Sequence, residues 1–418
     1  MQDRELLEAM FSAAVKAADP LTGIRKHLPA PPKNGRTVVI GAGKGAAQMA
    51  AALENVWNGE LSGVVVTRYG YGCETKSIEI LEASHPVPDA AGLAGAKRLM
   101  ETVSRLSEND LIIALICGGG SALLPAPPEG LTLEDEVALN ETLLASGAPI
   151  SAMNVVRKHL STIKGGRLAA ATKARVVSLI VSDIPGDNPA FVASGPTIPD
   201  ATTRQDALAI VEQYKLKLPA AMIAHLNSPA ADAPKPDDPI FARHEHFVIA
   251  SAGVSLEAAA EVARVNGVTP YILSDSVEGE SRDVALVHAA LAREVAQRDR
   301  PFAKPAVLLS GGETTVTLRG KGGKGGRNGE FALAFALAID GHTITALVAD
   351  TDGIDGSETN AGAFADGTSA KRIRVAGLDG RKLLDGNDSF SGFSAIGDVF
   401  ETGPTGTNVN DFRAVLVR

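Results

Sequence analysis

Residues 37–57 read TVVIGAGKGAAQMAAALENVW, and this stretch decides the fold. Its first part, TVVIGAG, is an apolar run that ends in glycines, which is typical of a short strand buried on both faces. The alanine-rich part that follows has the composition of a helix. A buried strand that turns through glycines into a helix is the unit from which helix-covered parallel sheets are built.

The same alternation continues along the chain. Further strands are predicted at 62–68, 77–83, 110–120 and 174–183 and, beyond a stretch of proline, alanine and aspartate at 226–241, at 246–251, 271–275, 304–313, 344–350 and 413–418. We therefore predict an α/β protein with two domains, each a mostly parallel sheet flanked by helices. The N-terminal Rossmann-like domain is expected to span residues 1–235 and the C-terminal α/β domain residues 236–418. The active site is expected in the interdomain cleft, where ligands of such sheets bind.

Composition excludes several classes of protein. The net charge of −9 argues against a general nucleic-acid binder, which needs a basic face. No apolar run approaches the roughly 18 residues of a membrane helix, and the N-terminal stretch lacks the apolar centre of a signal peptide. The two cysteines, Cys73 and Cys117, are too few for a disulfide framework or a cysteine zinc site. A cytoplasmic protein is expected, and a homo-oligomer is compatible with the sequence.

The first glycine turn, GAGKGAA at 41–47, matches the G-x-G-x-x-A pattern of dinucleotide-binding turns. Such a unit should carry an acidic residue at the end of its second strand, but Arg68 stands there. Lys44 is suited to a transferring phosphoryl group, with Gly41 and Gly43 as phosphate-binding backbone. The alternative is a tight structural turn with a solvated lysine.

A second glycine turn, ICGGGSALL at 116–124, follows another apolar strand. Its backbone N–H groups predict a binding site for a carboxylate or a phosphate, formed by Gly118, Gly119, Gly120 and Ser121. A packing turn with a serine cap is an open alternative. Ser121 as a hydrolase nucleophile is a weaker one, because the G-x-S-x-G elbow is absent.

Acidic residues follow two other strands. Asp183 and Asp187 lie in VSDIPGDNPAFVASGPT (181–197), where they could hold a cation or a substrate hydroxyl. Asp350 and Asp352 lie in VADTDGIDGSETNAGAF (348–364), at a spacing suited to magnesium with substrate phosphates. We predict Asp187, Asp350 and Asp352 as metal ligands. Capping of turns is the alternative for each aspartate. His85 is a candidate substrate contact or a structural histidine.

A further candidate binding site is the cationic, glycine-rich stretch SGGETTVTLRGKGGKGGRNGE at 310–330. We expect Gly311 and Gly312 to end a strand, TTVTLRG to return as another, and the cationic loop to lead into a helix. Backbone dipoles and side-chain charge together predict an anion site. Its candidate residues are Gly325, Gly326, Arg327 and Asn328. A flexible solvated loop is the alternative, above all for Lys321 and Lys324, and no Walker A pattern occurs.

Eight stretches of the sequence, in this order, resemble motifs of the class II glycerate 2-kinase (MOFRL) family. They are VVIGAGKGA, SHPVPD, ICGGGSALL, MNVVRKHLSTIKGGRLA, VSDIPGDNPAFVASGPT, LSGGETTVT, GKGGRNGEFAL and ADTDGIDG. The resemblance implies phosphorylation of D-glycerate by ATP with Mg²⁺, giving 2-phosphoglycerate, in two α/β domains. It also implies Lys44 and Arg327 as the active-site pair. We expect Asp183 to accept the hydroxyl proton.

Members of this family also carry the label hydroxypyruvate reductase, which would be an NAD(P)H-dependent hydride transfer. The G-x-G-x-x-A turn supports this alternative. The missing ribose-binding acid and the second cationic loop favour the kinase.

Overall fold

The computed structural model describes residues 2–318, 322–405 and 407–418. The chain forms two compact units, which we call the first unit (Pro20–Ile184 and Asn188–Ile249) and the second unit (Met1–Asp19, Pro185–Asp187 and Ala250–Arg418). Each unit has its own sheet with helices packed against it, which confirms the predicted two-domain α/β architecture. Within the described residues, no helix is both long and apolar enough to cross a membrane.

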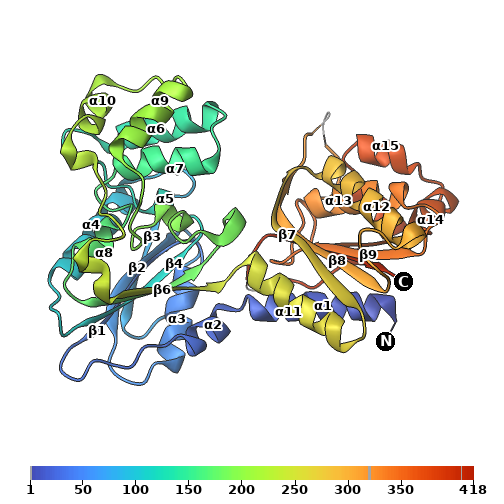
Figure 1. Ribbon diagram of the computed structural model, residues 1–418, viewed down its shortest axis with the longest axis horizontal. Coiled ribbons are helices and arrows are strands. Elements are labelled where there is room, and N and C mark those ends of the chain that lie inside the picture. The colour runs from blue at the N-terminus through green and yellow to red at the C-terminus, as the bar shows by residue number, and fades with distance from the viewer. Residues whose placement is uncertain (1, 319–321, 406) are drawn as a thin grey trace. The chain divides into compact units, whose positions relative to one another are not determined.

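The sheet of the first unit has the strand order β3-β2-β1-β4-β5-β6 (Figure 1). Its strands are β1 (Thr37–Ala42), β2 (Ser62–Arg68), β3 (Ile78–Ala83), β4 (Leu111–Cys117), β5 (Arg175–Val181) and β6 (His244–Ala250). The pairings among β1 to β5 are parallel, as predicted. This order is that of dinucleotide-binding folds, whose ligands bind at the carboxyl ends of the strands beside β1 and β4.

Helices cover this sheet and build a second, smaller core. They are α2 (Pro20–Lys26), α3 (Ala46–Val56), α4 (Ala90–Ser104), α5 (Gly120–Leu123), α6 (Leu133–Ala145), α7 (Ile150–His159), α8 (Arg167–Ala170), α9 (Arg204–Gln213) and α10 (Ala220–Leu226), with 3-10 turns η2 (Val192–Ser194), η3 (Pro229–Ala231) and η4 (Pro239–Arg243). Helices α6, α7, α9 and α10 lie together away from the sheet (Figure 1). Their apolar side chains form one buried cluster.

The sheet of the second unit is mixed. Its order is β11-β10-β9-β12-β8-β7, with β7 (Thr269–Glu280), β8 (Ala306–Thr315), β9 (Ile344–Asp350), β10 (Gly362–Asp366), β11 (Val399–Phe400) and β12 (Asp411–Val417). β7 pairs with β8 in parallel, but β12 inserts between β8 and β9 and is antiparallel to both. β10 is antiparallel to its neighbours as well. Strands β7, β8, β9 and β11 thus share one direction, in keeping with the predicted mostly parallel sheet, whereas β10 and β12 run antiparallel to their neighbours.

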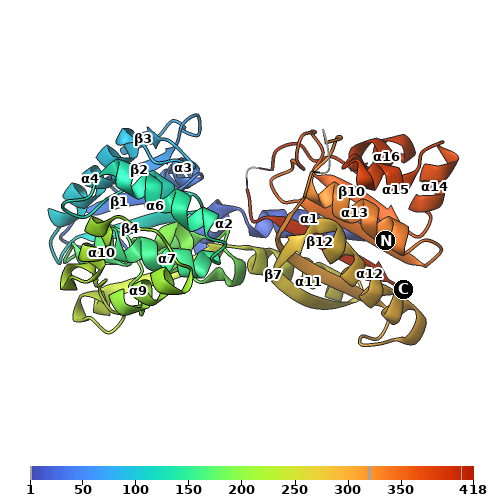
Figure 2. The same ribbon diagram turned by 90° about the horizontal axis from the view of Figure 1, so that it is seen from above.

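Alternation along the strands divides the core of the second unit between two faces. Val307 and Leu309 of β8 pack towards one cluster, whereas Ala306 and Leu308 pack towards the other. The first face is covered by α1 (Asp3–Ala17) and α11 (Ala252–Val265), and the second by α12 (Ser281–Arg298) and α13 (Arg327–Ala338) (Figure 1). Figure 2 shows α14 (Ser369–Val375), α15 (Gly380–Asp385) and α16 (Ser389–Ile396) grouped beside α13. The short turn η1 (Pro185–Asp187) also belongs to this unit.

The predicted boundary between residues 235 and 236 needs correction at both ends of the first unit. The stretch 226–241 is not a connection between domains, because its apolar side chains, such as Ala231 and Phe241, are buried in cores of the first unit. That unit continues through β6 to Ile249. The N-terminal helix α1 instead belongs to the second unit, where Leu7 and Phe11 are buried against its sheet.

Candidate active site

Four predicted site residues of the first unit gather at one edge of its sheet. Lys44 follows β1, His85 follows β3, Gly119 follows β4 and Asp183 follows β5. A Cβ atom on Gly119 would lie 3.0 Å from Lys44 Cγ and 3.1 Å from His85 Nε2. A Cβ atom on the adjacent Gly118 would overlap the Asp183 carboxylate. Because the carboxyl ends of parallel strands meet at one edge, residues far apart in the sequence form one polar cluster there.

The first glycine turn uses its own amides internally. The N–H of Gly43 donates to Val66 O at 3.1 Å, and that of Lys44 donates to Gly118 O at 2.8 Å. The N–H of Gly45 donates to Cys117 Sγ at 3.2 Å. A dinucleotide-binding turn offers such amides to the pyrophosphate. This turn instead ties β1 to β2 and β4.

Packing explains why the turn needs glycines. A Cβ on Gly41 would lie 2.5 Å from Leu115 O, and Gly43 has a φ of +139° with Cys117 directly against it. Both predicted phosphate-binding residues therefore have a structural role, which was the alternative reading of this turn. The side chain of Lys44 remains the functional candidate at this position.

Electrostatics within the cluster favour a neutral histidine beside a lysine. The pKa of His85 is lowered by burial and further by the positive charges of Lys44 and Arg68. The ring is therefore neutral at neutral pH and can donate or accept a hydrogen bond without adding charge. Burial raises the pKa of the nearby Cys117 thiol to about 12, which makes it a packing residue rather than a nucleophile.

Ser121 begins a chain of buried polar groups. Its Oγ lies 2.8 Å from Ser194 Oγ, and Ser194 Oγ donates to Asn154 Oδ1 at 3.0 Å. Ser194 and Asn154 are buried, whereas Ser121 is partly exposed. No histidine or carboxylate takes part in these bonds. Ser121 thus lacks the adjacent base that a hydrolase nucleophile needs.

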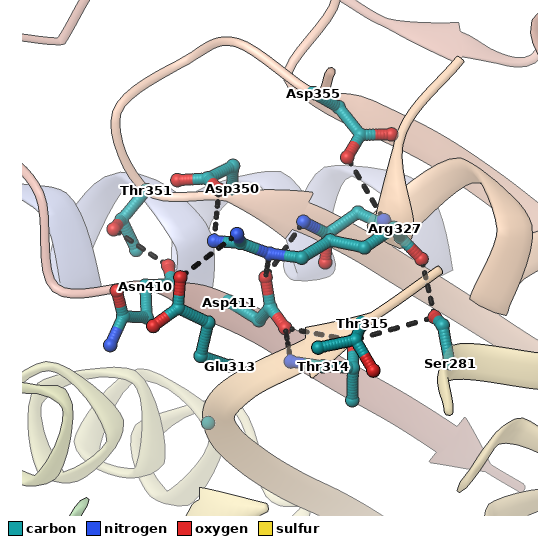
Figure 3. Close-up of polar contacts among 12 residues, drawn as sticks. Ser281, Glu313, Thr314, Thr315, Arg327, Asp350, Thr351, Asp355, Asn410 and Asp411 are labelled. Carbon is teal, nitrogen blue, oxygen red and sulfur yellow. Dashed lines mark hydrogen bonds and ion pairs between the residues drawn. The ribbon is translucent and has the colours of Figure 1, made fainter. Parts of the chain in front are cut away.

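In the second unit, Arg327 is held by three carboxylates at the start of α13 (Figure 3). Its Nε donates to Asp411 Oδ1 at 2.6 Å, and its two terminal nitrogens lie 2.7 Å from Asp350 Oδ2 and 3.2 Å from Glu313 Oε1. Arg327 keeps 24% of its side-chain surface exposed. It is therefore a fixed cation with one accessible side.

Asp411 is the centre of this arrangement. Its Oδ1 also accepts from Asn328 Nδ2 at 2.9 Å, and its Oδ2 accepts from the Thr314 N–H at 3.1 Å and from Arg413. Burial by itself would raise the pKa of Asp411, but the charges of Arg413 and Arg327 hold it below its ordinary value. Asp411 is thus a buried carboxylate that keeps its charge and orients Arg327.

The remaining acidic residues crowd this region with carboxyl groups, which shifts their pKa values upward. Burial raises the pKa of Asp350 to about 8, with Asp352 and Asp411 adding to the rise and Arg327 opposing it. Burial also raises the pKa of Asp355 to about 6, although it accepts the N–H groups of Asn328 at 2.9 Å and Gly329 at 2.7 Å. Carboxyl groups outnumber guanidinium groups here, and a further cation would lower the raised pKa values by favouring the ionised carboxylates.

The predicted metal ligands do not form one group. Asp187 lies in η1, where its carboxylate and that of Asp275 both approach Gly253. The described residues include no group of three His, Cys, Asp or Glu side chains placed to hold a metal ion. Asp350 and Asp352 remain a pair: the Asp352 N–H donates to Asp350 Oδ1 at 3.1 Å.

The glycines around Arg327 serve close packing. Gly311 and Gly312 were predicted to end a strand, but β8 continues through them to Thr315. Gly312 has a φ of +117° and lies opposite Val277, where β7 is irregular. Gly325 packs against Ser389, and Gly326 packs against Asp355. β8 ends at Thr315, so TTVTLRG is not a separate strand over its described residues. Lys321 lies outside the described residues.

Sequence reasoning missed Asp411, Glu313, Asn154 and Ser194. Asp411 had a readable signal, since Asp411 and Arg413 share one face of the otherwise apolar strand DFRAVLV. A charged pair on the face of a buried strand indicates a polar network. Asn154 lies on α7, within a stretch of ordinary helical composition that gives no such signal.

Two family models match the chain. Residues 6–227 match a domain of unknown function (DUF4147), and residues 306–411 match the MOFRL family. The chain is 49% identical over 418 residues to an Agrobacterium vitis protein whose name gives hydroxypyruvate reductase as a provisional activity, covering 99% of this chain and 94% of that protein.

Two relatives named for a kinase activity also match along their whole length. A glycerate 2-kinase of Pyrococcus horikoshii is 41% identical over 434 residues, covering 100% of this chain and 98% of that protein. A D-glycerate 2-kinase of Thermotoga maritima is 37% identical over 418 residues, covering 99% and 98%.

Crystal structures from the same two organisms are similar to this chain. The protein from Pyrococcus horikoshii has a TM-score of 0.87 at 40% identity, covering 100% of this chain and 99% of its own. The glycerate kinase from Thermotoga maritima has a TM-score of 0.89 at 37% identity, covering 99% of each chain.

Proposed function

We propose that this chain, which belongs to the MOFRL family, is a glycerate 2-kinase. It transfers the γ-phosphoryl group of ATP to the 2-hydroxyl of D-glycerate and releases 2-phosphoglycerate and ADP. Full-length similarity to two glycerate 2-kinases supports the activity. The chemistry needs cations, positioning and a proton acceptor, and little covalent catalysis.

The observation that carries this proposal is the cluster around Gly119, where Lys44 and His85 pack against one glycine and Asp183 against the next. In the proposed reaction, Lys44 neutralises the charge of the transferring phosphoryl group. Asp183 accepts the proton of the attacking hydroxyl, and neutral His85 orients the substrate through a hydrogen bond. The amides of Gly119 and Gly120, with Ser121, bind the rest of the small acid.

Arg327 and its carboxylates contribute the second set of charges. A phosphate oxygen that approaches the accessible side of Arg327 competes with Glu313, the longest and most exposed of its ion pairs. We propose that Arg327 binds the nucleotide phosphates in this way. The fixed position of its Nε on Asp411 keeps the guanidinium aligned when Glu313 is displaced.

Magnesium belongs to this proposal as a companion of the nucleotide. Mg²⁺ prefers one or two carboxylates together with substrate phosphates, so the pair Asp350 and Asp352 fits without a third protein ligand. Asp352 uses Oδ1 to accept the Ile354 N–H at 2.8 Å, which leaves Oδ2 for a cation. A Mg²⁺ ion held by this pair would supply positive charge that offsets the charge of the substrate phosphates.

A hydride transfer to hydroxypyruvate is the second candidate, favoured by the strand order of the first unit and by the provisional name of one relative. Two observations weigh against it. The amides of the first glycine turn are already paired within the protein. The second strand, β2, ends in Arg68, whose guanidinium stacks on Tyr71 at 4.4 Å, whereas a dinucleotide-binding fold carries an acidic residue there to bind the ribose. The kinase is therefore our conclusion.

Paired assays on one purified sample test the proposal. We expect ADP release that depends on D-glycerate, ATP and Mg²⁺, and no oxidation of NADH or NADPH with hydroxypyruvate. The Lys44→Ala variant should lower kcat by at least about a hundredfold, whereas Lys97→Ala, which removes an exposed lysine on α4, should not. Hydride transfer without glycerate-dependent ADP release would replace the kinase by the reductase.

A further inference from the structure

The polar chain Ser121–Ser194–Asn154, which we call the serine relay, has a fixed direction. Ser194 donates its only proton to Asn154 Oδ1 at 3.0 Å. The 2.8 Å contact between the two hydroxyls then requires Ser121 to be the donor and Ser194 the acceptor. Ser121 has thereby committed its proton, so its Oγ can only accept a hydrogen bond from a ligand.

The relay ends in groups that cannot take up a proton. An amide and two hydroxyls have no site that is protonated near neutral pH, so Ser121 cannot act as a general base. The hydroxyl that reacts must lose its proton during phosphoryl transfer. A hydroxyl bound to Ser121 is therefore one that keeps its proton.

The surrounding backbone holds the relay in place at a cost in strain. Ala193 and Ser194 have φ values of +53° and +59°, which non-glycine residues rarely adopt. The carbonyls of Ser194 and Gly195 accept the N–H groups of Gly165 at 3.1 Å and Gly166 at 2.8 Å. Asn154 is buried, and its Nδ2 has no hydrogen-bond partner in the part of the chain that the structure describes. Strain and an unpaired amide together indicate a functional role rather than an optimised core.

We infer that the serine relay reads the non-reacting hydroxyl of a 2,3-dihydroxy acid. This inference rests on the proposed function and adds the determinant of its substrate specificity. Ser121 lies two residues beyond Gly119, against which Lys44 and His85 pack. Of the three polar groups of D-glycerate, the carboxylate can only accept and the 2-hydroxyl reacts. The 3-hydroxyl is the one that donates to Ser121 and keeps its proton.

D-Lactate provides the test, because it has the carboxylate and the 2-hydroxyl of D-glycerate but lacks the 3-hydroxyl. We would measure kcat/KM for D-glycerate and the inhibition constant of D-lactate as a competitor. In Ser121→Ala, kcat/KM for D-glycerate should fall about tenfold, the effect of one lost hydrogen bond, while the lactate constant stays within about twofold. Ser194→Ala should reduce kcat/KM for D-glycerate by a smaller factor and leave the inhibition constant of D-lactate unchanged.

If Ser121→Ala weakens kcat/KM for D-glycerate and the inhibition constant of D-lactate by the same factor, the inference is overturned, because a general distortion of the site affects both acids alike. If neither quantity changes, Ser121 does not contact the substrate and the inference is overturned as well. An unchanged glycerate value in Ser194→Ala would overturn the role of the relay. The melting temperature of each variant serves as the fold control. A wild-type protein without glycerate-dependent ADP release would contradict the proposed function itself, so the two failures are distinguishable.

Discussion

At the scale of single residues, Asp411 decides how Arg327 is held. Asp411 is fully buried between Arg327 and Arg413, so its removal leaves two guanidinium groups undercompensated. We expect Asp411→Asn to lower the free energy of unfolding by about 3 kcal/mol, measured by urea denaturation. The matched control is Glu313→Gln, whose carboxylate also pairs with Arg327 but is 55% exposed. The Glu313→Gln substitution should lower the free energy of unfolding by less than about 1 kcal/mol. Equal losses in both variants would contradict the view that burial gives Asp411 its importance.

The sequence predicts residues whose local pattern carries the chemistry and misses those that act through distant contacts. Lys44 and Arg327 stand out because glycine-rich turns place a cation beside a helix start. The pair of Arg327 and Asp411 spans 84 residues, and the pair of Ser194 and Asn154 spans 40. Such partners are decided by how strands and loops pack, which no local pattern records.

At the scale of elements, the turn after β4 is built to bring Lys44 and His85 against one glycine. Gly119 has a φ of +80°, so Gly119→Ala strains the backbone and places a methyl group 3.0 Å from Lys44 Cγ. We expect a loss of about 1–2 kcal/mol in stability and at least about a tenfold loss in kcat/KM. Gly130→Ala is the control, since Gly130 has a φ of +85° with no atom within 4 Å of the added Cβ. That variant should lose the same stability and keep its activity; an active Gly119→Ala enzyme would refute the role of this turn.

The start of α13 provides a prediction about pH. Burial raises the pKa of Asp355 to about 6, above the value of 3.8 expected for the unfolded chain. The folded protein therefore binds this proton more tightly than the unfolded chain does. The contribution of the protonated Asp355 carboxyl to the free energy of unfolding is complete below about pH 4, and it is lost as the pH rises through about 6.

Asp355→Asn removes this titration. The unfolding free energy of the wild type relative to this variant should fall by about 2.4 kcal/mol between pH 4 and pH 7, measured by urea denaturation at several pH values. A difference that stays constant over this range would show that Asp355 keeps its ordinary pKa.

Predictions of elements succeed where burial on both faces makes a strand apolar throughout, as in β1, β4 and β9. Pairing is harder to predict. β12 comes from the end of the chain and inserts between β8 and β9, antiparallel to both, although these two strands run in the same direction. The residue pattern of a strand predicts which of its faces are buried, but it does not predict whether the neighbouring strand runs parallel or antiparallel.

At the scale of the whole molecule, the assignment of α1 to the second unit can be tested with one substitution and one intrinsic probe. Phe11 is buried and packs edge-on against Phe400 and Phe412, with ring centroids 5.1 and 5.6 Å away. Phe11→Ala should therefore destabilise the second unit by about 3–5 kcal/mol. Trp57, the single tryptophan of the chain, lies in the first unit, so its fluorescence reports on that unit, whereas circular dichroism reports on the helices of both.

If the two units unfold separately, Phe11→Ala moves only part of the circular dichroism transition to lower urea and leaves the Trp57 transition where it is in the wild type. Glu8→Ala, on the exposed face of the same helix, should shift neither signal by more than about 0.5 kcal/mol. A Trp57 transition that moves together with the circular dichroism signal would mean that the two units unfold as one cooperative body. A Trp57 signal that moves by itself would place α1 in the first unit, where the sequence-based boundary had put it.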